Sequence, residues 1–329
     1  MLQSVILIFL VAFALGLVLT PVVYKLSKKF KASQTILKYV EEHKLKQGTP
    51  TMGGIIFILA CFISCLIFLK KDSTLALISL VVMLAYGVLG FLDDFIKIKF
   101  KQNQGLRAYQ KIIGQVGIAF FIALFCYKSN LVGSEVVIPF TDITFDLGFF
   151  IIPFIMFVYL ALVNSVNLID GLDGLAGGVS FFCLIAFGIL IVLSANFNNG
   201  QSYFIEQQNL SLICFAMAGA ILPFLILNVY PAKIFMGDTG SLALGGLITS
   251  VAVFSRLEFF ILIFGISYVV TAVSDIIQVV YFKLTKKRVF LMAPLHHHFQ
   301  KKGMNENKIV FVYIVVTAIV SLIAIMLTI

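Results

Sequence analysis

Apolar runs near twenty residues recur along this chain of 329 residues, and they constrain its fold more than any other feature. A run of that length crosses the hydrocarbon core of a bilayer as an α-helix. The strands of a membrane barrel would instead show shorter segments in which apolar and polar residues alternate. The composition agrees, since 61% of the residues are hydrophobic and 12% are charged, against about a quarter charged in soluble domains. We therefore predict an all-α polytopic membrane protein.

The runs predict about ten transmembrane helices in a single integral membrane domain that covers residues 1–329. No polar segment is long enough to form a separate soluble domain. The first run lacks a basic start and a small-residue cleavage site, so it is predicted to be a spanning helix rather than a cleaved leader. The predicted spans are 2–24, 53–69, 74–92, 112–127, 147–163, 179–195, 210–227, 242–255, 259–282 and 309–328.

Positive charge is distributed unevenly between the predicted loops. The loops 25–52, 93–111, 164–178, 228–241 and 283–308 alternate onto one side and hold 20 of the 24 Lys and Arg residues. Because cytoplasmic loops carry an excess of Lys and Arg, we predict that this side is cytoplasmic and that both termini are extracytoplasmic. Every polar, glycine-rich or histidine-rich motif falls on the same side. The sequence therefore predicts an active site in a cleft at the cytoplasmic face.

The net charge of +9 follows mostly from this topology. A basic cytoplasmic face also attracts anionic lipids and phosphorylated substrates. We expect the lipid bilayer as a partner and no nucleic acid, because the chain has no basic soluble module that would bind it. The external segment 128–146 is expected to be a connector in which a small hairpin can form.

Two adjacent acids, Asp93 and Asp94, follow the third predicted span. The negative end of the helix dipole disfavours each carboxylate there by a few tenths to ~1 kcal/mol, so a structural role explains the pair poorly. Lys97, four residues after Asp93, would offset part of this cost if the helix continues. Carboxylates near a bilayer surface are typical ligands of Mg²⁺. The pair is therefore a candidate metal site.

The segment Asn164–Gly178 is expected to be a polar loop between two spans. Its glycines allow a backbone to lie close against a ligand, although Asp-Gly pairs are also common in ordinary turns. The segment carries no positive charge. We therefore expect Asp170 and Asp173 to accept hydrogen bonds from a nucleoside rather than to hold phosphate.

Helix starts on the predicted cytoplasmic side carry further candidates. Lys46 and the Thr-Pro-Thr-Met-Gly-Gly segment 49–54 precede the second span, and Arg107 and Lys111 lie one turn apart before the fourth. Asp238 lies just before the eighth span, beside Phe235. Backbone N–H groups at helix starts attract anions, so the helix starts with Lys46, Arg107 and Lys111 are expected to bind phosphate. The ring of Phe235 is expected either to stack on a base or simply to pack beside the acid.

Three consecutive histidines, His296, His297 and His298, stand in the last cytoplasmic loop. Consecutive histidines are a weak zinc signal, and we expect them to contact phosphate as cations or proton donors. Gln278 lies about one turn from Asp275 near the inner end of the ninth span. A polar or ionisable residue inside a membrane helix is a functional candidate.

These motifs together resemble those of the phospho-MurNAc-pentapeptide transferase family, within the polyprenyl-phosphate N-acetylhexosamine-1-phosphate transferases. They are GTPTMGG, the Asp93–Asp94 pair, NxxNxxDGxDGLAGG, FMGDTGS and PLHHHF, and they cover nearly the whole chain. The resemblance implies a multi-pass enzyme of the bacterial cytoplasmic membrane. It would transfer phospho-MurNAc-pentapeptide from UDP-MurNAc-pentapeptide to undecaprenyl phosphate, giving lipid I and UMP in peptidoglycan synthesis. It also implies Mg²⁺ as cofactor and a homodimer.

The resemblance also implies roles for single residues. Asp238 would hold Mg²⁺ with Asp93 and Asp94 beside it, and Asp93 would take the proton of the lipid phosphate. The catalytic candidates are Asp93, Asp94, Asp238, His296, His297 and His298. Lys111 and Asn164 are added to the substrate-binding candidates because of their place in the predicted loops. The full set of candidates for substrate binding is Lys46, Thr51, Lys111, Asn164, Asn167, Asp170, Gly171, Leu172, Asp173, Asn228, Phe235 and Gln278.

Other functions stay open at this point. A sister enzyme would use UDP-GlcNAc. Turnover of the two UDP-sugars distinguishes it from an enzyme that uses UDP-MurNAc-pentapeptide. A secondary transporter would place its binding groups near the midplane of the bilayer, whereas the motifs here lie at one face. A non-catalytic scaffold leaves the three acids unexplained. Direct attack and a covalent intermediate are both compatible with the sequence.

Overall fold

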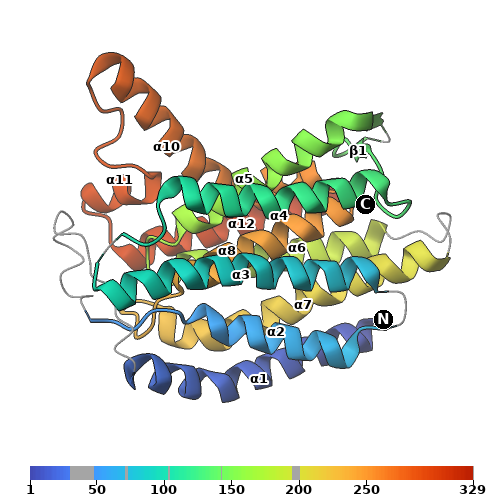
Figure 1. Cartoon of the computed structure of the whole chain (residues 1–329), viewed down its shortest axis with the longest axis horizontal. Helices are drawn as coiled ribbons and strands as arrows, with labels where there is room; N and C mark the ends of the chain where they lie inside the picture. The colour runs from blue at the N-terminus through green and yellow to red at the C-terminus, as the bar shows by residue number, and fades with distance from the viewer. Residues whose placement is uncertain (30–47, 71–72, 103, 142, 195–200, 329) are drawn as a thin grey trace.

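The computed structural model describes residues 1–29, 48–70, 73–102, 104–141, 143–194 and 201–328. Within these ranges the chain is helical apart from 3-10 turns and one short hairpin (Figure 1). The helices are α1 (Leu2–Lys29), α2 (Gly54–Phe68), α3 (Thr74–Phe100), α4 (Ala108–Lys128), α5 (Ile151–Ile169), α6 (Leu175–Ser194), α7 (Gln201–Asn228), α8 (Gly237–Phe254), α9 (Ile261–Phe264), α10 (Ile266–Thr285), α11 (Leu295–Lys301) and α12 (Glu306–Thr328). The hairpin pairs β1 (Glu135–Val137) with β2 (Thr144–Asp146) in antiparallel register, as the sequence allowed.

Nine helices in the described ranges are long and apolar enough to cross a membrane, so the helical polytopic prediction is confirmed. The second predicted span differs, because α2 has 15 residues and rises only about 22 Å, less than the ~30 Å hydrocarbon core. The amides of Gly53 and Gly54 donate to the carbonyls of Phe235 and Met236 at 2.8 and 3.0 Å. The residues before Gly54 therefore pair with another segment instead of extending the helix.

Two helix ends differ from the predicted spans in ways that affect the site. α3 continues to Phe100, so Asp93 and Asp94 lie inside a helix and not at its end. α8 already begins at Gly237, so Asp238 lies in its first turn and not before it. The length of an apolar run underestimates the length of a helix when the polar ends of that helix are buried against neighbouring helices.

The loop predicted at 164–178 is also shorter than expected. Asn164 and Asn167 belong to α5, which ends at Ile169, and α6 begins at Leu175. The turn itself comprises residues 170–174. The asparagine amides are satisfied inside the bundle by hydrogen bonds to neighbouring side chains, so the helix does not have to end where polar residues begin.

The ninth predicted span, 259–282, is not one helix. It comprises the 3-10 turn η4 (Glu258–Phe260), α9 and α10, which are separated at Gly265. Glycine disfavours a helix interior by about 1 kcal/mol relative to alanine, so a break is least costly there. Beyond the break α10 projects away from the bundle (Figure 1), and apolar side chains such as Leu284 are exposed on it.

α8 lies at the centre of the bundle, packed along α3 and α5. All of its residues from Thr239 to Phe254 are buried. Polar contacts join these helices within the core, since the Tyr159 hydroxyl lies 2.8 Å from the Ser250 hydroxyl. α1 begins and α12 ends at the same end of the bundle (Figure 1). The cytoplasmic and extracytoplasmic assignment of the two ends stays a prediction.

Candidate active site

Three carboxylates meet where the carboxyl-terminal part of α3 passes the amino terminus of α8. Asp93, Asp94 and Asp238 each offer one oxygen, and these oxygens lie within 4.8 Å of one another. Asp93 and Asp94 are buried, and the Asp238 side chain is 17% exposed. The helix-packing geometry thus joins residues that lie more than 140 positions apart in the sequence.

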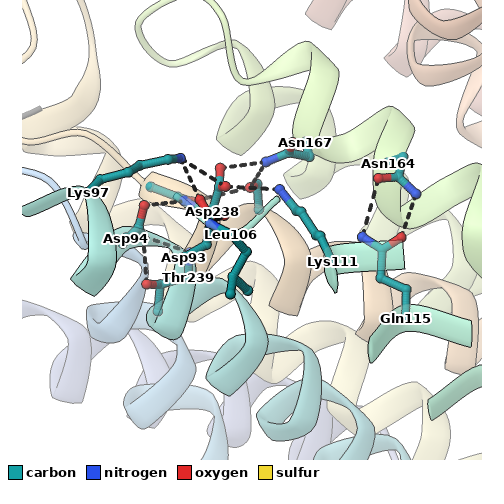
Figure 2. Close-up of polar contacts among 12 residues, drawn as sticks. Asp93, Asp94, Lys97, Leu106, Lys111, Gln115, Asn164, Asn167, Asp238 and Thr239 are labelled. Atoms are coloured by element: carbon teal, nitrogen blue, oxygen red, sulfur yellow. Dashed lines mark hydrogen bonds and ion pairs between the residues drawn. The ribbon is translucent and has the colours of Figure 1, made fainter. Parts of the chain in front are cut away.

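Asp238 accepts hydrogen bonds from three side chains of three helices (Figure 2). Its Oδ2 lies 3.1 Å from Lys97 Nζ on α3 and 2.9 Å from Lys111 Nζ on α4. Its Oδ1 accepts a hydrogen bond of 2.8 Å from the Asn167 amide on α5, which also donates to the Ser241 hydroxyl. The carboxylate is therefore held through both oxygens, and the two lysines compensate its charge at Oδ2.

Asp93 is paired with the same lysine. Lys97 Nζ lies 2.6 Å from Asp93 Oδ2, the contact expected from their spacing of four residues once the helix continues. Asp93 Oδ1 accepts the backbone amide of Leu106 at 2.8 Å. This bond ties the segment between α3 and α4 to the site and directs Lys111 toward Asp238.

Asp94 faces the backbone of α8. It accepts hydrogen bonds from the amides of Asp238 and Thr239 at 3.2 and 2.9 Å, and from the Thr239 hydroxyl at 2.7 Å. The two neighbouring acids of α3 thus have different surroundings: Asp93 contacts Lys97 and the Leu106 amide, and Asp94 faces the first turn of another helix.

The chemistry of the cluster fits Mg²⁺, whose preferred ligands are carboxylate and phosphate oxygens. Thr51 is a further polar residue beside the carboxylates. Its side chain is buried, and its hydroxyl has no hydrogen-bond partner among the described residues. A Cβ at Gly237 would lie 2.8 Å from that hydroxyl, so Thr51 borders the start of α8. A buried hydroxyl without a partner is costly, and a bound ligand would satisfy it.

Asn164 lies next to the cluster but is not part of it. Its amide exchanges hydrogen bonds of 2.7 and 3.2 Å with the buried Gln115 side chain of α4. Gln115 lies one turn after Lys111 on α4, as Asn167 lies about one turn after Asn164 on α5. The amide pair therefore fixes the spacing of the two helices that supply Lys111 and Asn167.

The 170–174 turn lies against the histidine helix α11. A Cβ at Gly171 would lie 2.7 Å from His296 Nε2 and 2.9 Å from His297 Nε2, so only glycine allows this approach. His296 is fully buried, and the two imidazole rings are 4.4 Å apart. Burial raises the pKa of the Asp170 carboxyl well above its usual range, and the charges of Asp238 and Asp94 add to this effect.

Asp173 and Asn228 connect the same turn to other segments. Asp173 Oδ2 accepts the Ala232 amide at 2.9 Å, and its own amide donates to Glu306 at 2.8 Å. Asn228 accepts the Gly174 amide and donates to the Ile234 carbonyl. Both side chains are buried in these contacts, as is Leu172. Here they hold the backbone around the site, and nucleoside binding by them stays a prediction.

Gln278 and His298 hold the segment between α10 and α11. Gln278 Oε1 accepts the amides of Val289 and Phe290 at 3.1 and 2.9 Å. His298 Nδ1 accepts the Leu291 amide at 3.0 Å. The three histidines thus differ in position, since His296 and His297 face the 170–174 turn and His298 supports this segment.

Two of the remaining candidates lie before α2 and α8. Lys46 lies outside the described residues. Phe235 contributes its backbone, which accepts from Gly53 and donates to the Pro50 carbonyl, and its side chain is partly buried. Sequence reasoning missed Gln115, Thr239 and Ser241 as members of the network. Only their positions could have indicated them, since Gln115 lies one turn after Lys111, Thr239 directly follows Asp238, and Ser241 lies about one turn after Asp238.

The fold and the acidic cluster define a polytopic membrane protein with a site suited to phosphoryl chemistry at one end of its helices. A glycosyl transferase family 4 model matches residues 76–256, and a phospho-N-acetylmuramoyl-pentapeptide-transferase signature matches residues 46–58. The chain is 47% identical over 320 residues to the phospho-N-acetylmuramoyl-pentapeptide-transferase of Thermoanaerobacter sp. (strain X514), covering 97% of both chains. It is 42% identical over 315 residues to that of Clostridium novyi (strain NT), covering 95% of this chain and 94% of the relative. The chain therefore belongs to the phospho-N-acetylmuramoyl-pentapeptide transferase family.

Proposed function

We propose that the protein transfers phospho-MurNAc-pentapeptide from UDP-MurNAc-pentapeptide to undecaprenyl phosphate at the cytoplasmic face of the bacterial cytoplasmic membrane. A phosphate oxygen of the lipid forms a bond to the phosphorus that carries the sugar. The bond between that phosphorus and the oxygen of the UMP phosphate breaks. The products are UMP and lipid I, so the step contributes to peptidoglycan synthesis.

The observation that carries the proposal is the contact of Asp93 and Asp238 with two lysines at the end of spanning helices. Transfer between phosphates requires neutralisation and alignment of charge more than covalent protein chemistry. Lys97 and Lys111 supply positive charge, and Asn167 fixes the direction of the Asp238 carboxylate. Under this proposal Asp93 accepts the proton of the lipid phosphate.

Asp238 and Asp93 are the residues that would hold Mg²⁺. When bound, the ion would neutralise the diphosphate and the developing charge on the leaving UMP. The 170–174 turn with His296 and His297 is the surface we assign to the nucleotide. The lipid acceptor would approach from the bilayer, and the homodimer expected from the family stays a prediction.

The proposal is tested by UMP release from UDP-MurNAc-pentapeptide, with and without undecaprenyl phosphate and with Mg²⁺ or EDTA. We expect release only when both the lipid and Mg²⁺ are present. Asp238→Asn should abolish it, while Asp146→Asn in the exposed hairpin serves as the matched control. Exclusive use of UDP-GlcNAc, uptake into liposomes without UMP release, or full activity of Asp238→Asn would refute the proposal.

A further inference from the structure

We propose that Asp94 is a positioning residue that caps the amino terminus of α8 and so holds Asp238 in place, and that it is not a ligand of the metal. Its effect on catalysis rests on the function proposed above. The capping role itself does not, because it concerns contacts between two helices of the chain.

α8 begins without a cap from its own sequence. The first amides of an α-helix have no intrahelical acceptor, and residue Met236, which precedes α8, makes no side-chain capping bond. Asp94 accepts the amides of Asp238 and Thr239, two of these unpaired donors. A carboxylate is also favoured by the positive end of the helix dipole. The cap of α8 is thus supplied by α3.

The acceptor capacity of Asp94 is largely used by these contacts. A carboxylate offers about four lone-pair positions, and the Thr239 hydroxyl takes a third. Asp94 is 1% exposed, and a Cβ at Gly237 would lie 2.5 Å from its Oδ2. A metal bound to Asp94 would have to compete with these three capping bonds or use the single acceptor position that remains beside them. Mg²⁺ usually takes only one or two protein carboxylates, which Asp93 and Asp238 can supply.

The backbone of α3 lies directly against the same turn. Gly90 is one turn before Asp94, and a Cβ at Gly90 would lie 2.7 Å from the backbone nitrogen of Thr239. Both residues thus face the first turn of α8. α3 fixes this turn by shape at Gly90 and by hydrogen bonding at Asp94.

The two possible roles predict opposite effects on the metal-free protein. Carboxylates that form a ligand set repel one another when the metal is absent, so removing one charge should stabilise the fold. Removing a helix cap should destabilise it. The direction of the change in the thermal unfolding midpoint in EDTA therefore separates the roles.

The first experiment measures this midpoint in detergent with EDTA. We expect Asp94→Asn to lower it by at least about 2 °C, because the amide nitrogen of Asn cannot accept a bond that the lost carboxylate oxygen accepted. Thr239→Val, which removes one of the three bonds, should lower it less. The double variant should lie close to Asp94→Asn because both changes affect the same cap. Thr239→Ser keeps the hydroxyl and is the matched control. A midpoint of Asp94→Asn at or above that of the wild type would overturn the proposal.

The second experiment follows UMP release as Mg²⁺ is varied. We expect Thr239→Val to raise the Mg²⁺ concentration for half-maximal rate by up to about tenfold while the KM for the nucleotide stays unchanged. Thr239→Ser should restore the wild-type dependence. An unchanged Mg²⁺ dependence in Thr239→Val would overturn the proposal, and this variant decides the question even if Asp94→Asn does not fold. If the chain catalyses a different reaction, the midpoints in EDTA still test the cap.

Discussion

Replacement of Gly90 by alanine should damage the site by displacing Asp238, although the substitution removes no polar side chain. A methyl group there would lie 2.7 Å from Thr239 N and closer still to the Asp238 carbonyl. Ordinary contacts of a Cβ begin near 3.4 Å. Since both neighbours are backbone atoms in buried helices, α3 and the first turn of α8 must separate by more than about 1 Å.

A misplacement of about 1 Å in a catalytic group can cost on the order of a hundredfold in rate. We therefore expect the kcat/KM for UMP release by Gly90→Ala to fall by about a hundredfold. Intrinsic helix propensity acts in the opposite direction, because alanine favours a helix interior by about 1 kcal/mol over glycine. A loss of activity would thus be a packing effect and not a weakening of α3 itself.

Gly87→Ala is the matched control on the same helix. The nearest atoms to its added methyl group would be Ala243 Cβ and Ile58 Cδ1, both at 3.5 Å, which is ordinary contact. We expect wild-type kcat/KM and an equal or higher thermal midpoint. Both variants are compared by steady-state UMP release and by thermal unfolding. Wild-type kcat/KM in Gly90→Ala would refute the reasoning.

Three further predictions follow from contacts at and around the site. Lys111→Gln removes one of the two cations that contact Asp238, so kcat/KM should fall by at least about tenfold. Lys111→Arg should retain more of the activity. An unchanged kcat/KM in Lys111→Gln would show that this ion pair does not contribute to the reaction. Gln115→Leu removes both hydrogen bonds to the Asn164 side chain, which keeps only its bond to the Leu160 carbonyl. Stability should fall by about 1–3 kcal/mol, and a thermal midpoint no lower than that of the wild type would contradict the pairing. Glu258 lies in η4 outside the spanning helices, and burial raises the pKa of its carboxyl to about 8 from 4.5. Because the pKa of this carboxyl is higher in the folded protein, the wild type should lose stability as pH rises from about 4.5 to about 8, by up to about 5 kcal/mol. Glu258→Gln should show a flatter profile of thermal midpoint against pH. Parallel profiles of the two proteins would show that Glu258 does not cause the pH dependence.

The membrane-spanning helical class could be predicted from the sequence because apolar run length depends directly on bilayer thickness. Helix ends could not. Asn164 and Asp93 stand beyond apolar runs, yet both lie within helices because Gln115 and Lys97 satisfy them inside the protein. Sequence patterns show which residues are polar but not which polar residues become each other's partners.

The acids of the site were predictable as a group, and their separate surroundings were not. Adjacent residues on a helix point about 100° apart, so Asp93 and Asp94 necessarily face different neighbours. Which neighbour each one meets depends on how α8 packs against α3. The contact of Gly171 with His296 and His297 likewise joins motifs more than 120 residues apart. Such contacts arise from tertiary packing, which local patterns do not contain.

The central position of α8 also bears on how the protein is assembled in the membrane. Its spanning window is the most completely buried of the nine candidate helices in the described ranges, and its hydropathy is among the lowest. A helix that contacts protein on all sides gains little stability from contact with lipid. Its glycines and hydroxyl groups also lower its hydrophobicity, so it is a weak signal for membrane insertion. Apart from the short turn η4, the elements that pack most against it, α2, α3, α5, α6 and α7, all precede it in the chain. The helix that carries Asp238 therefore depends on helices synthesised earlier to form the site it enters.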